Sequence, residues 1–378
     1  MLYLLAERFP FAPWTLFRYV TVRAGGALLT ALLLSWWIGP WIVAWLRDLK
    51  FRQEYRPKDV KAAGDATAHA ADTAKRGTPT MGGIMILLTV DTSVLLWARW
   101  NPLVILVLVT FVAFAGLGLY DDWMKVSRQN ADGVAGRLKL VVQFGVAAGV
   151  VAYLWGWDTG HPLVTELHLP FVPARYALVA GPLAAAGAIA LSVITIVGSS
   201  NAVNLTDGMD GLATGCTIIC TGVFLVLTYI AGHREIAKYL LVPSVNGAGE
   251  LCVFCGALFG AGLGFLWWNA HPAEVFMGDT GSLAIGGALG VMAVAIHQPF
   301  TLLLTGGVFV AEALSVVLQV GWFKYTRRTT GTGRRILLMS PLHHHFRKQG
   351  LAESKIVTRF YIAAILCGVL ALATLKIR

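Results

Sequence analysis

The stretch LVILVLVTFVAFAGLGLYDDWMK, residues 103–125, joins an uncharged apolar run to two adjacent aspartates, Asp121 and Asp122. The run is close to the ~20 residues with which a helix crosses a hydrocarbon core. Acids directly behind such a run are expected at the depth of lipid headgroups. The stretch therefore predicts a membrane-spanning helix that brings two carboxylates to the membrane surface.

Composition extends this interpretation to the whole chain. Of 378 residues, 57% are hydrophobic and 13% are charged, and the mean hydropathy is +0.68, whereas soluble domains have roughly 25% charged residues. The apolar segments are too long for the ~10-residue alternating strands of a membrane barrel. We predict an all-α integral membrane protein, a single transmembrane domain over residues 1–378. Ten spans are expected, at 21–46, 80–98, 102–120, 138–156, 175–197, 212–231, 250–268, 281–297, 300–323 and 358–375.

The distribution of positive charge predicts the orientation. The segments after the first, third, fifth, seventh and ninth spans hold 21 of the 30 Lys and Arg residues, and short loops rich in these residues stay in the cytoplasm. Both termini are therefore expected on the outer side of the membrane, with five loops in the cytoplasm. The formal charge of +10 is explained by topology and by attraction to anionic lipid or phosphate, without nucleic acid.

Two features of the sequence have ordinary explanations. Glu7 and Arg8 interrupt the first apolar run, so residues 1–20 are expected to be retained and not cleaved as a signal. Cys252 and Cys255 have CxxC spacing inside a predicted span, where packing is a commoner role than metal or redox chemistry. No disulfide framework is indicated.

The five inner loops carry the polar motifs. Acids gather in or next to these loops, and each adjoins the end of a predicted span. The acids are Asp121, Asp122, Asp207, Asp210, Glu274 and Asp279.

Such a cluster has two physical explanations. One is a solvated rim, in which each exposed ion pair contributes about 0 to 1 kcal/mol. The other is a divalent-metal site, because Mg²⁺ is usually held by one or two carboxylates and by substrate phosphate oxygens. Asp207 and Asp210 would point the same way if their segment turned like the start of a helix. Glycines on both sides of Asp279 allow backbone amides to approach a phosphate, and together these motifs favour the metal site.

Five motifs in a fixed order carry a family resemblance: GTPTMGG (77–83), LYDDWMK (119–125), NAVNLTDGMDGLA (201–213), FMGDTGSLA (276–284) and SPLHHHF (340–346). Over nearly its whole length the chain resembles the polyprenyl-phosphate N-acetylhexosamine-1-phosphate transferases. The triple histidine resembles the branch that uses UDP-N-acetylmuramoyl-pentapeptide.

The resemblance implies a Mg²⁺-dependent phosphoglycosyl transferase of the bacterial inner membrane, with its active site facing the cytoplasm. It would transfer phospho-N-acetylmuramoyl-pentapeptide from UDP-N-acetylmuramoyl-pentapeptide to undecaprenyl phosphate. The products would be UMP and lipid I, the first lipid-linked precursor of peptidoglycan. A homodimer is compatible with the sequence, which carries no mark of oligomeric state.

The resemblance also assigns roles to residues of this sequence. Asp279 would be the metal ligand, and Asp121 and Asp122 the essential acids near the polyprenyl phosphate, with Asp121 the favoured base. Lys139 fits a phosphate contact, and Lys125 is a second candidate. The resemblance also implies catalysis by His343 and stacking of Phe276 near uracil. The full set of remaining site residues that it implies is Lys75, Thr80, Asn204, Asp207, Asp210, Phe276, Gln319, His343, His344 and His345.

The chemistry leaves the reaction path open. The acceptor is a phosphate monoester with a second pKa near 6, so at pH 7 it is mostly dianionic and Asp121 has little proton to remove. The two aspartates would then organise metal and acceptor at least as much as they act as a base. A two-step path, in which an aspartate attacks first and forms a phosphoryl-enzyme, is the rival.

Three alternatives to this function were weighed: a proton-coupled transporter, a sister transferase using UDP-N-acetylglucosamine, and a non-catalytic scaffold. Asp91 and Glu312 lie inside predicted spans, where acids suggest a functional role, but the polar residues are concentrated in the loops and not at a midplane site. The segment KYTRRTTGTGRRILLM (324–339) is longer and more basic than the family pattern. Surface charge explains it better than a phosphate cradle.

Overall fold

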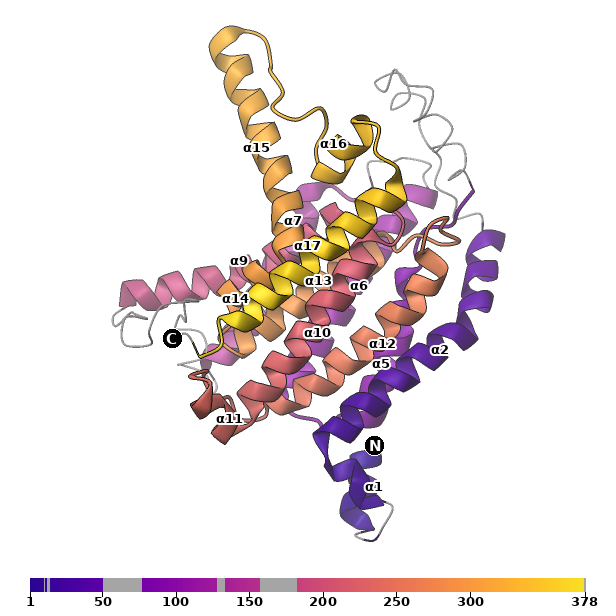
Figure 1. Cartoon of the computed structure of the whole chain (residues 1–378), viewed down its shortest axis with the longest axis vertical. Coiled ribbons are helices and arrows are strands. Elements are labelled where there is room, and N and C mark those ends of the chain that lie inside the picture. The colour runs from indigo at the N-terminus through magenta and orange to yellow at the C-terminus, as the bar shows by residue number, and fades with distance from the viewer. Residues whose placement is uncertain (10, 12–13, 50–76, 128–132, 157–181, 377–378) are drawn as a thin grey trace.

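The computed structural model describes the chain except residues 10, 12–13, 50–76, 128–132, 157–181 and 377–378 (Figure 1). Among the described residues, nine helices are long and apolar enough to cross a membrane. They are α2 (Val20–Asp48), α6 (Pro102–Ser127), α7 (Gly136–Gly156), α9 (Pro182–Thr206), α10 (Leu212–Gly232), α12 (Leu251–Asn269), α13 (Gly278–Ala295), α15 (Gly307–Thr330) and α17 (Glu353–Ala373). A tenth apolar helix, α5 (Gly83–Trp97), has 15 residues.

The all-α membrane architecture is thereby confirmed, and the ten predicted spans correspond to these ten helices. The orientation of the termini stays a prediction. Shorter helices occupy the connections: α1 (Leu2–Arg8), η1 (Trp14–Arg18), α11 (Arg234–Tyr239), η3 (Ala248–Glu250), α14 (Pro299–Thr305) and α16 (Leu342–Lys348).

The predicted span 175–197 ends too early, because α9 continues to Thr206. The polar residues at its end do not stop the helix, since their side chains are satisfied inside the bundle. Ser199 Oγ donates to Gly286 O at 2.7 Å, and Ser200 Oγ donates to Leu283 O at 2.9 Å. A segment expected to be a loop is therefore the polar end of a packed helix.

The predicted span 300–323 is interrupted. α14 ends at Thr305 and α15 begins at Gly307, with the adjacent glycines Gly306 and Gly307 at the break. Glycine has the lowest helix propensity after proline. Gly307 also lies against α17, because a Cβ built on it would be 2.7 Å from Cys367 Sγ.

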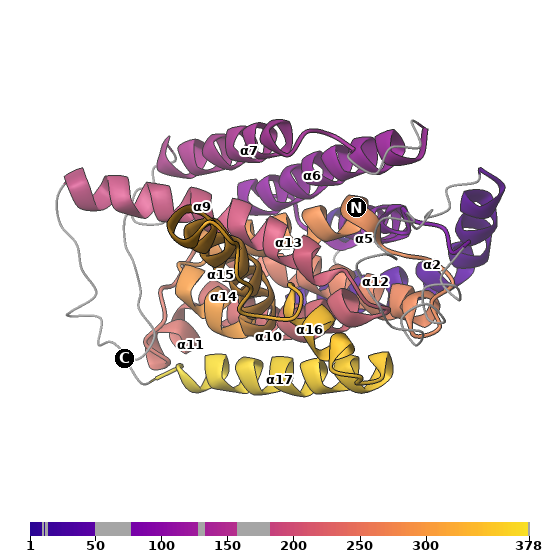
Figure 2. The ribbon, with the colours of Figure 1, turned by 90° about the horizontal axis from the view of Figure 1, so that it is seen from above.

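Helix α13 is the centre of the bundle. In its most apolar 18-residue window 94% of residues are buried, against 50% for α6 and 28% for α7. Seen from above, α7 and α17 lie on opposite edges with α13 between them (Figure 2). Its sequence GDTGSLAIGGALGVMAVA is rich in glycine and alanine, and such small residues let helix backbones approach closely in a membrane.

Gly118 of α6 shows how close this approach is. A Cβ at Gly118 would be 2.1 Å from the carbonyl oxygen of Asp279 on α13, so the two backbones are in direct contact there. Two residues earlier on the same helix, Gly116 has nothing within 4 Å of the equivalent position. The contact at Gly118 fixes the distance between the acids of α6 and the start of α13.

We predict that Gly118→Ala lowers the thermal stability of the purified protein, because the added methyl forces α6 and α13 apart. Overpacking of this kind costs about 1 to 3 kcal/mol. The matched control is Gly116→Ala, which adds the same methyl on the open face of α6 and should leave the melting temperature near that of the wild type. Equal melting temperatures for the two variants would contradict the close contact.

Candidate active site

The two aspartates of the opening stretch lie in the last turns of α6. The sequence predicts a span that ends at residue 120, just before the acids, whereas α6 continues to Ser127. Lys125 explains the continuation, because its Nζ lies 2.6 Å from Asp121 Oδ2, an i,i+4 pair, and 3.8 Å from Asp122 Oδ1. Both aspartate side chains are buried, at 0% and 3% exposure, so this is not a solvated rim.

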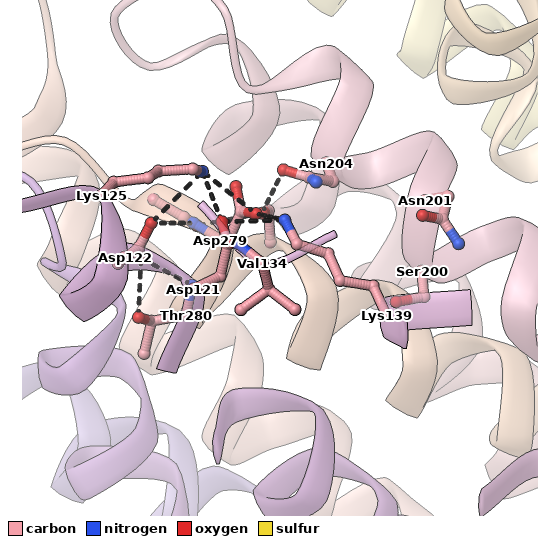
Figure 3. A network of polar contacts seen from close by, with 12 residues as sticks. Asp121, Asp122, Lys125, Val134, Lys139, Ser200, Asn201, Asn204, Asp279 and Thr280 are labelled. Atoms are coloured by element: carbon pink, nitrogen blue, oxygen red, sulfur yellow. Dashed lines mark hydrogen bonds and ion pairs between the residues drawn. The ribbon is translucent and has the colours of Figure 1, made fainter. Parts of the chain in front are cut away.

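Asp122 caps the start of α13. Its Oδ2 accepts hydrogen bonds from Thr280 N at 3.1 Å and Thr280 Oγ1 at 2.8 Å, and its Oδ1 accepts from Asp279 N at 3.3 Å (Figure 3). A carboxylate at the N-terminus of a helix satisfies free backbone amides and interacts favourably with the helix dipole. Gly278 precedes this turn with φ +72, and a Cβ there would lie 2.6 Å from Asp122 Oδ2. Asp122 therefore positions Asp279 as well as belonging to the site.

Asp121, Asp122 and Asp279 form one cluster. One carboxylate oxygen from each lies within 4.8 Å of the others. Two like charges 4 Å apart repel by about 4 kcal/mol at an effective dielectric constant of about 20, so the cluster needs counter-charge.

Two lysines supply that charge (Figure 3). Lys139, from the first turn of α7, places its Nζ 2.8 Å from Asp121 Oδ2 and 2.7 Å from Asp279 Oδ2. Lys125 Nζ lies 3.3 Å from the same oxygen of Asp279. Asp121 Oδ1 also accepts from Val134 N at 2.7 Å. Three carboxylates thus share two ammonium groups, an arrangement that suits an incoming cation and phosphate oxygens.

The segment between α9 and α10 borders this cluster. Asn204 Oδ1 accepts a hydrogen bond from Ser282 Oγ at 3.0 Å, which ties α9 to α13. Burial, with the charges of Asp279 and Asp122, raises the pKa of Asp207 to about 7, although a backbone hydrogen bond from Gly278 acts in the opposite direction. The charge of Asp207 is therefore coupled to the carboxylate cluster.

Asp210 points elsewhere. Its Oδ2 lies 2.9 Å from His271 Nδ1 and accepts from Ala273 N at 3.2 Å, while its backbone N donates to Glu353 Oε1 at 3.1 Å. Asp207 and Asp210 were predicted to point the same way if their segment turned like the start of a helix. Residues 207–211 form turns and not a helix start, so this condition does not hold. Asp210 joins the loop before α13 to the start of α17.

The predicted nucleotide-site residues Thr80 and Phe276 are neighbours. Phe276 N donates to Pro79 O at 2.9 Å, and Gly82 N donates to Phe276 O at 2.8 Å. A Cβ on Gly278 would be 2.9 Å from Thr80 Oγ1, so Thr80 reaches the edge of the cluster. Lys75 lies outside the described residues.

Glu274 lies apart from the carboxylate cluster. Glu274 lies in the same loop as Phe276, but it is half-exposed and contacts Arg47, with 3.6 Å between Oε2 and the guanidinium. This is an ordinary surface ion pair.

The three histidines separate into different environments. His343 is buried, and its ring packs against the loop that carries Asp207, because a Cβ on Gly208 would be 2.3 Å from Nε2. The His344 ring lies 4.2 Å from the His343 ring, centroid to centroid. His345 Nδ1 accepts from Leu338 N at 3.2 Å, in the segment that leads to α16. His343 is thus the histidine that the structure places against the site loop.

Gln319 binds the same segment, which leads into α16. Its Oε1 accepts from Ile336 N and Leu337 N, each at 3.0 Å, and its Nε2 donates to Leu337 O at 3.0 Å. The Gln319 side chain therefore binds the backbone of this segment and is not directed at the carboxylate cluster. A role in substrate binding stays a prediction.

Glu312 was considered from sequence only as an intramembrane acid. In the structure its side chain, fully buried, lies 3.2 Å from His343 Nδ1 through Oε2 and accepts from His343 N at 3.1 Å through Oε1. It holds α16 to α15 through the backbone of His343 and lies beside the His343 ring. A signal was present, since an acid in an apolar helix needs a partner, but the histidine is distant in sequence.

A cluster of carboxylates and lysines at the end of apolar helices can hold a divalent cation and phosphate oxygens beside a bilayer. Comparison with known proteins agrees. The family description "Glycosyl transferase family 4" matches residues 104–297, and "Phospho-N-acetylmuramoyl-pentapeptide-transferase signature 1" matches residues 75–87.

Curated relatives match almost the full chain. A phospho-N-acetylmuramoyl-pentapeptide-transferase of Desulfotalea psychrophila is 46% identical over 372 residues, covering 97% of each chain. One from Opitutus terrae is 47% identical with the same coverage, and one from Granulibacter bethesdensis is 45% identical over 381 residues, covering 99% of this chain and 98% of the relative. The chain belongs to glycosyl transferase family 4 and, within it, to the phospho-N-acetylmuramoyl-pentapeptide-transferase family.

We predict that Glu312 and His343 stabilise the protein as a coupled pair. Glu312→Leu removes the acceptor of the buried backbone N–H of residue 343 and the carboxylate beside the ring, and should cost about 1 to 3 kcal/mol. His343→Leu should cost a similar amount, because it removes the ring next to Glu312 Oε2 while the backbone N–H still donates to Oε1. In the double variant the loss should be smaller than the sum of the two single losses, by about 0.5 to 3 kcal/mol. Melting temperatures of the four proteins measure this cycle, and strictly additive losses would contradict the pairing.

Proposed function

We propose that this protein transfers phospho-N-acetylmuramoyl-pentapeptide from UDP-N-acetylmuramoyl-pentapeptide to undecaprenyl phosphate, forming lipid I and UMP. The observation that carries the proposal is the cluster of Asp121, Asp122 and Asp279, with Lys125 and Lys139 between the carboxylates. The names of the relatives supply the substrates. The location proposed is a bacterial inner membrane, with the cluster facing the cytoplasm and both termini in the periplasm.

The donor atoms of the cluster suit Mg²⁺, which prefers oxygen ligands. All three ligand groups are carboxylates, and Asp279 is the most exposed of them, at 14% of its side chain. We assign Asp279 as the residue that would hold the ion, with Asp121 beside it. When bound, Mg²⁺ neutralises charge on the diphosphate and improves UMP as a leaving group.

The lysines have a separate task in this proposal. Phosphoryl transfer depends mainly on positioning and on neutralising the non-bridging oxygens. Lys139 and Lys125 reach the cluster from α7 and α6, and their ammonium groups would turn from the carboxylates towards phosphate oxygens when substrates bind. Asp122, which caps α13, keeps Asp279 in place throughout.

Asp121 is the acid available to the acceptor. The acceptor phosphate is mostly dianionic at pH 7, so the main work assigned to Asp121 is to orient the lysines and the acceptor. Direct attack by the acceptor and a two-step path through an aspartyl phosphate both remain in the proposal. Rapid-quench experiments with donor alone separate them, because only the two-step path releases UMP in a burst without acceptor.

The recognition of the donor is assigned to the rim of the site. Asn204 and Asp207 border the cluster, with Phe276 proposed to stack near uracil and Thr80 at its edge. His343 and His344 are proposed to contact the diphosphate or sugar as hydrogen-bond donors.

The direct test uses detergent-solubilised protein and measures UMP. Release over many turnovers is expected only when UDP-N-acetylmuramoyl-pentapeptide, undecaprenyl phosphate and Mg²⁺ are all present, because without acceptor even the two-step path stops after one UMP per enzyme. Release with UDP-N-acetylglucosamine instead would assign the chain to the sister transferases. No release with either donor would overturn the proposal.

We predict that Asp279→Asn abolishes this release at ordinary Mg²⁺ concentrations, because an amide replaces the proposed ligand and its charge. Glu274→Gln is the matched control, since it neutralises an acid in the loop directly before α13 that lies outside the cluster, and it should retain wild-type turnover. A wild-type rate for Asp279→Asn would remove Asp279 as the metal ligand.

His344→Ala should weaken use of the nucleotide sugar more than use of the lipid, because it removes a donor at the rim. The measurement is the KM for each substrate, and the expected result is a higher KM for UDP-N-acetylmuramoyl-pentapeptide with little change for undecaprenyl phosphate. Unchanged kinetics with the full donor would count against the histidines in recognition.

A further inference from the structure

The exposed surface of α15 changes in character along the helix. The first exposed residues are aliphatic, with Leu314 at 51%, Val317 at 65% and Leu318 at 61%. Trp322 at 44% and Tyr325 at 60% come next, followed by the basic residues of the last turns. The C-terminal half of α15 extends beyond the other helices (Figure 1). Aliphatic, aromatic and basic side chains in that order are typical of a helix leaving the hydrocarbon core through the headgroup layer.

The chain then folds back along α15. Gly331 has φ +75 and reverses the direction, Thr326 Oγ1 accepts from Arg334 N at 2.8 Å, and Gln319 Oε1 binds the amides of Ile336 and Leu337. The returning limb repeats the order of the helix in reverse, with basic residues near the tip and apolar ones near the body. Ile336 and Leu338 are 57% and 51% exposed. We call residues 322–339 the basic hairpin.

The charge of this region is one-sided. Residues 313–352 contain seven Lys and Arg residues and no Asp or Glu. Within the part of the chain that the structure describes, no ion pair joins an acid to the exposed cations of the basic hairpin. These cations are Lys324, Arg327, Arg328, Arg334 and Arg335.

We propose that the basic hairpin binds the headgroups of anionic phospholipids and holds this end of the protein at the membrane surface. If the basic residues served only to orient the chain during membrane insertion, their positive charge would suffice. Exposed apolar side chains at matching levels on both limbs would then have no role. Basic residues combined with exposed apolar ones favour an anionic bilayer surface. Each basic residue near such a surface contributes roughly fivefold in affinity, so five of them select strongly for anionic lipid.

The consequence concerns α16, which begins two residues after Ser340 and carries the three histidines. A hairpin held at the lipid surface fixes the chain that leads into this helix. The lipid contact itself is independent of the transfer reaction proposed above.

The test places a reporter at the tip of the basic hairpin. Thr332→Cys, in a Cys367→Ser background that leaves only buried native cysteines, is labelled with an environment-sensitive fluorophore. The protein is reconstituted in nanodiscs of phosphatidylcholine alone or of phosphatidylcholine with phosphatidylglycerol. With phosphatidylglycerol the emission should shift to the blue and quenching by acrylamide should fall. Salt at about 1 M, where the Debye length is about 3 Å, should reduce the difference.

Two variants separate the basic hairpin from general charge effects. Replacing Arg327, Arg328, Arg334 and Arg335 by Gln should remove the lipid-dependent shift, with the melting temperature confirming that the protein is folded. Replacing Arg234 and Lys238 by Gln, both in α11 and away from the basic hairpin, should leave the shift intact. Identical emission and quenching in both lipids for the unaltered hairpin would overturn the proposal and direct attention to a soluble acidic partner.

Discussion

The contacts of Lys125 and Lys139 with Asp121 and Asp279 are the interaction on which the site depends. Three carboxylates within 4.8 Å of one another, at the end of an apolar bundle, would repel strongly without them. The two ammonium groups come from α6 and α7, so the same contacts that neutralise the acids also hold these helices to the start of α13. Charge balance and helix arrangement are therefore one property of this end of the molecule.

Small residues make this arrangement possible. The backbones of α6 and α13 touch at Gly118, and this contact lets Asp122 cap α13 directly. The cap in turn orients Asp279 towards Asp121. On the other side of the site, the buried Glu312 holds His343 against the loop of Asp207. An acid inside a membrane helix, which from sequence favoured a transporter, here has a local structural partner.

Much of the fold could be predicted from the sequence, because apolar runs of the length of a bilayer are a strong signal. The convergence of Asp121, Asp122 and Asp279 was also predicted, from acids that adjoin helix ends and from the order of the motifs. Prediction from sequence failed where tertiary contacts satisfy the hydrogen bonds of polar groups. Ser199 and Ser200 are polar enough to predict the end of a span, but their hydrogen bonds to α13 keep them in the helix. Asp210 contacts His271, which its spacing from Asp207 does not reveal. The pairing of Glu312 with His343 depends on the position of α16, which no local pattern indicates.

The most direct measurement of the central claim is the position of a bound divalent cation. Crystals prepared with Mn²⁺ in place of Mg²⁺, together with UMP, allow the ion to be located by its anomalous scattering. We predict a single site with Asp279 as a ligand, at a distance close to the ~2.0 to 2.1 Å at which oxygen ligands bind Mg²⁺. An ion bound instead between Asp210, His271 and Glu353, or none near Asp279, would contradict the account.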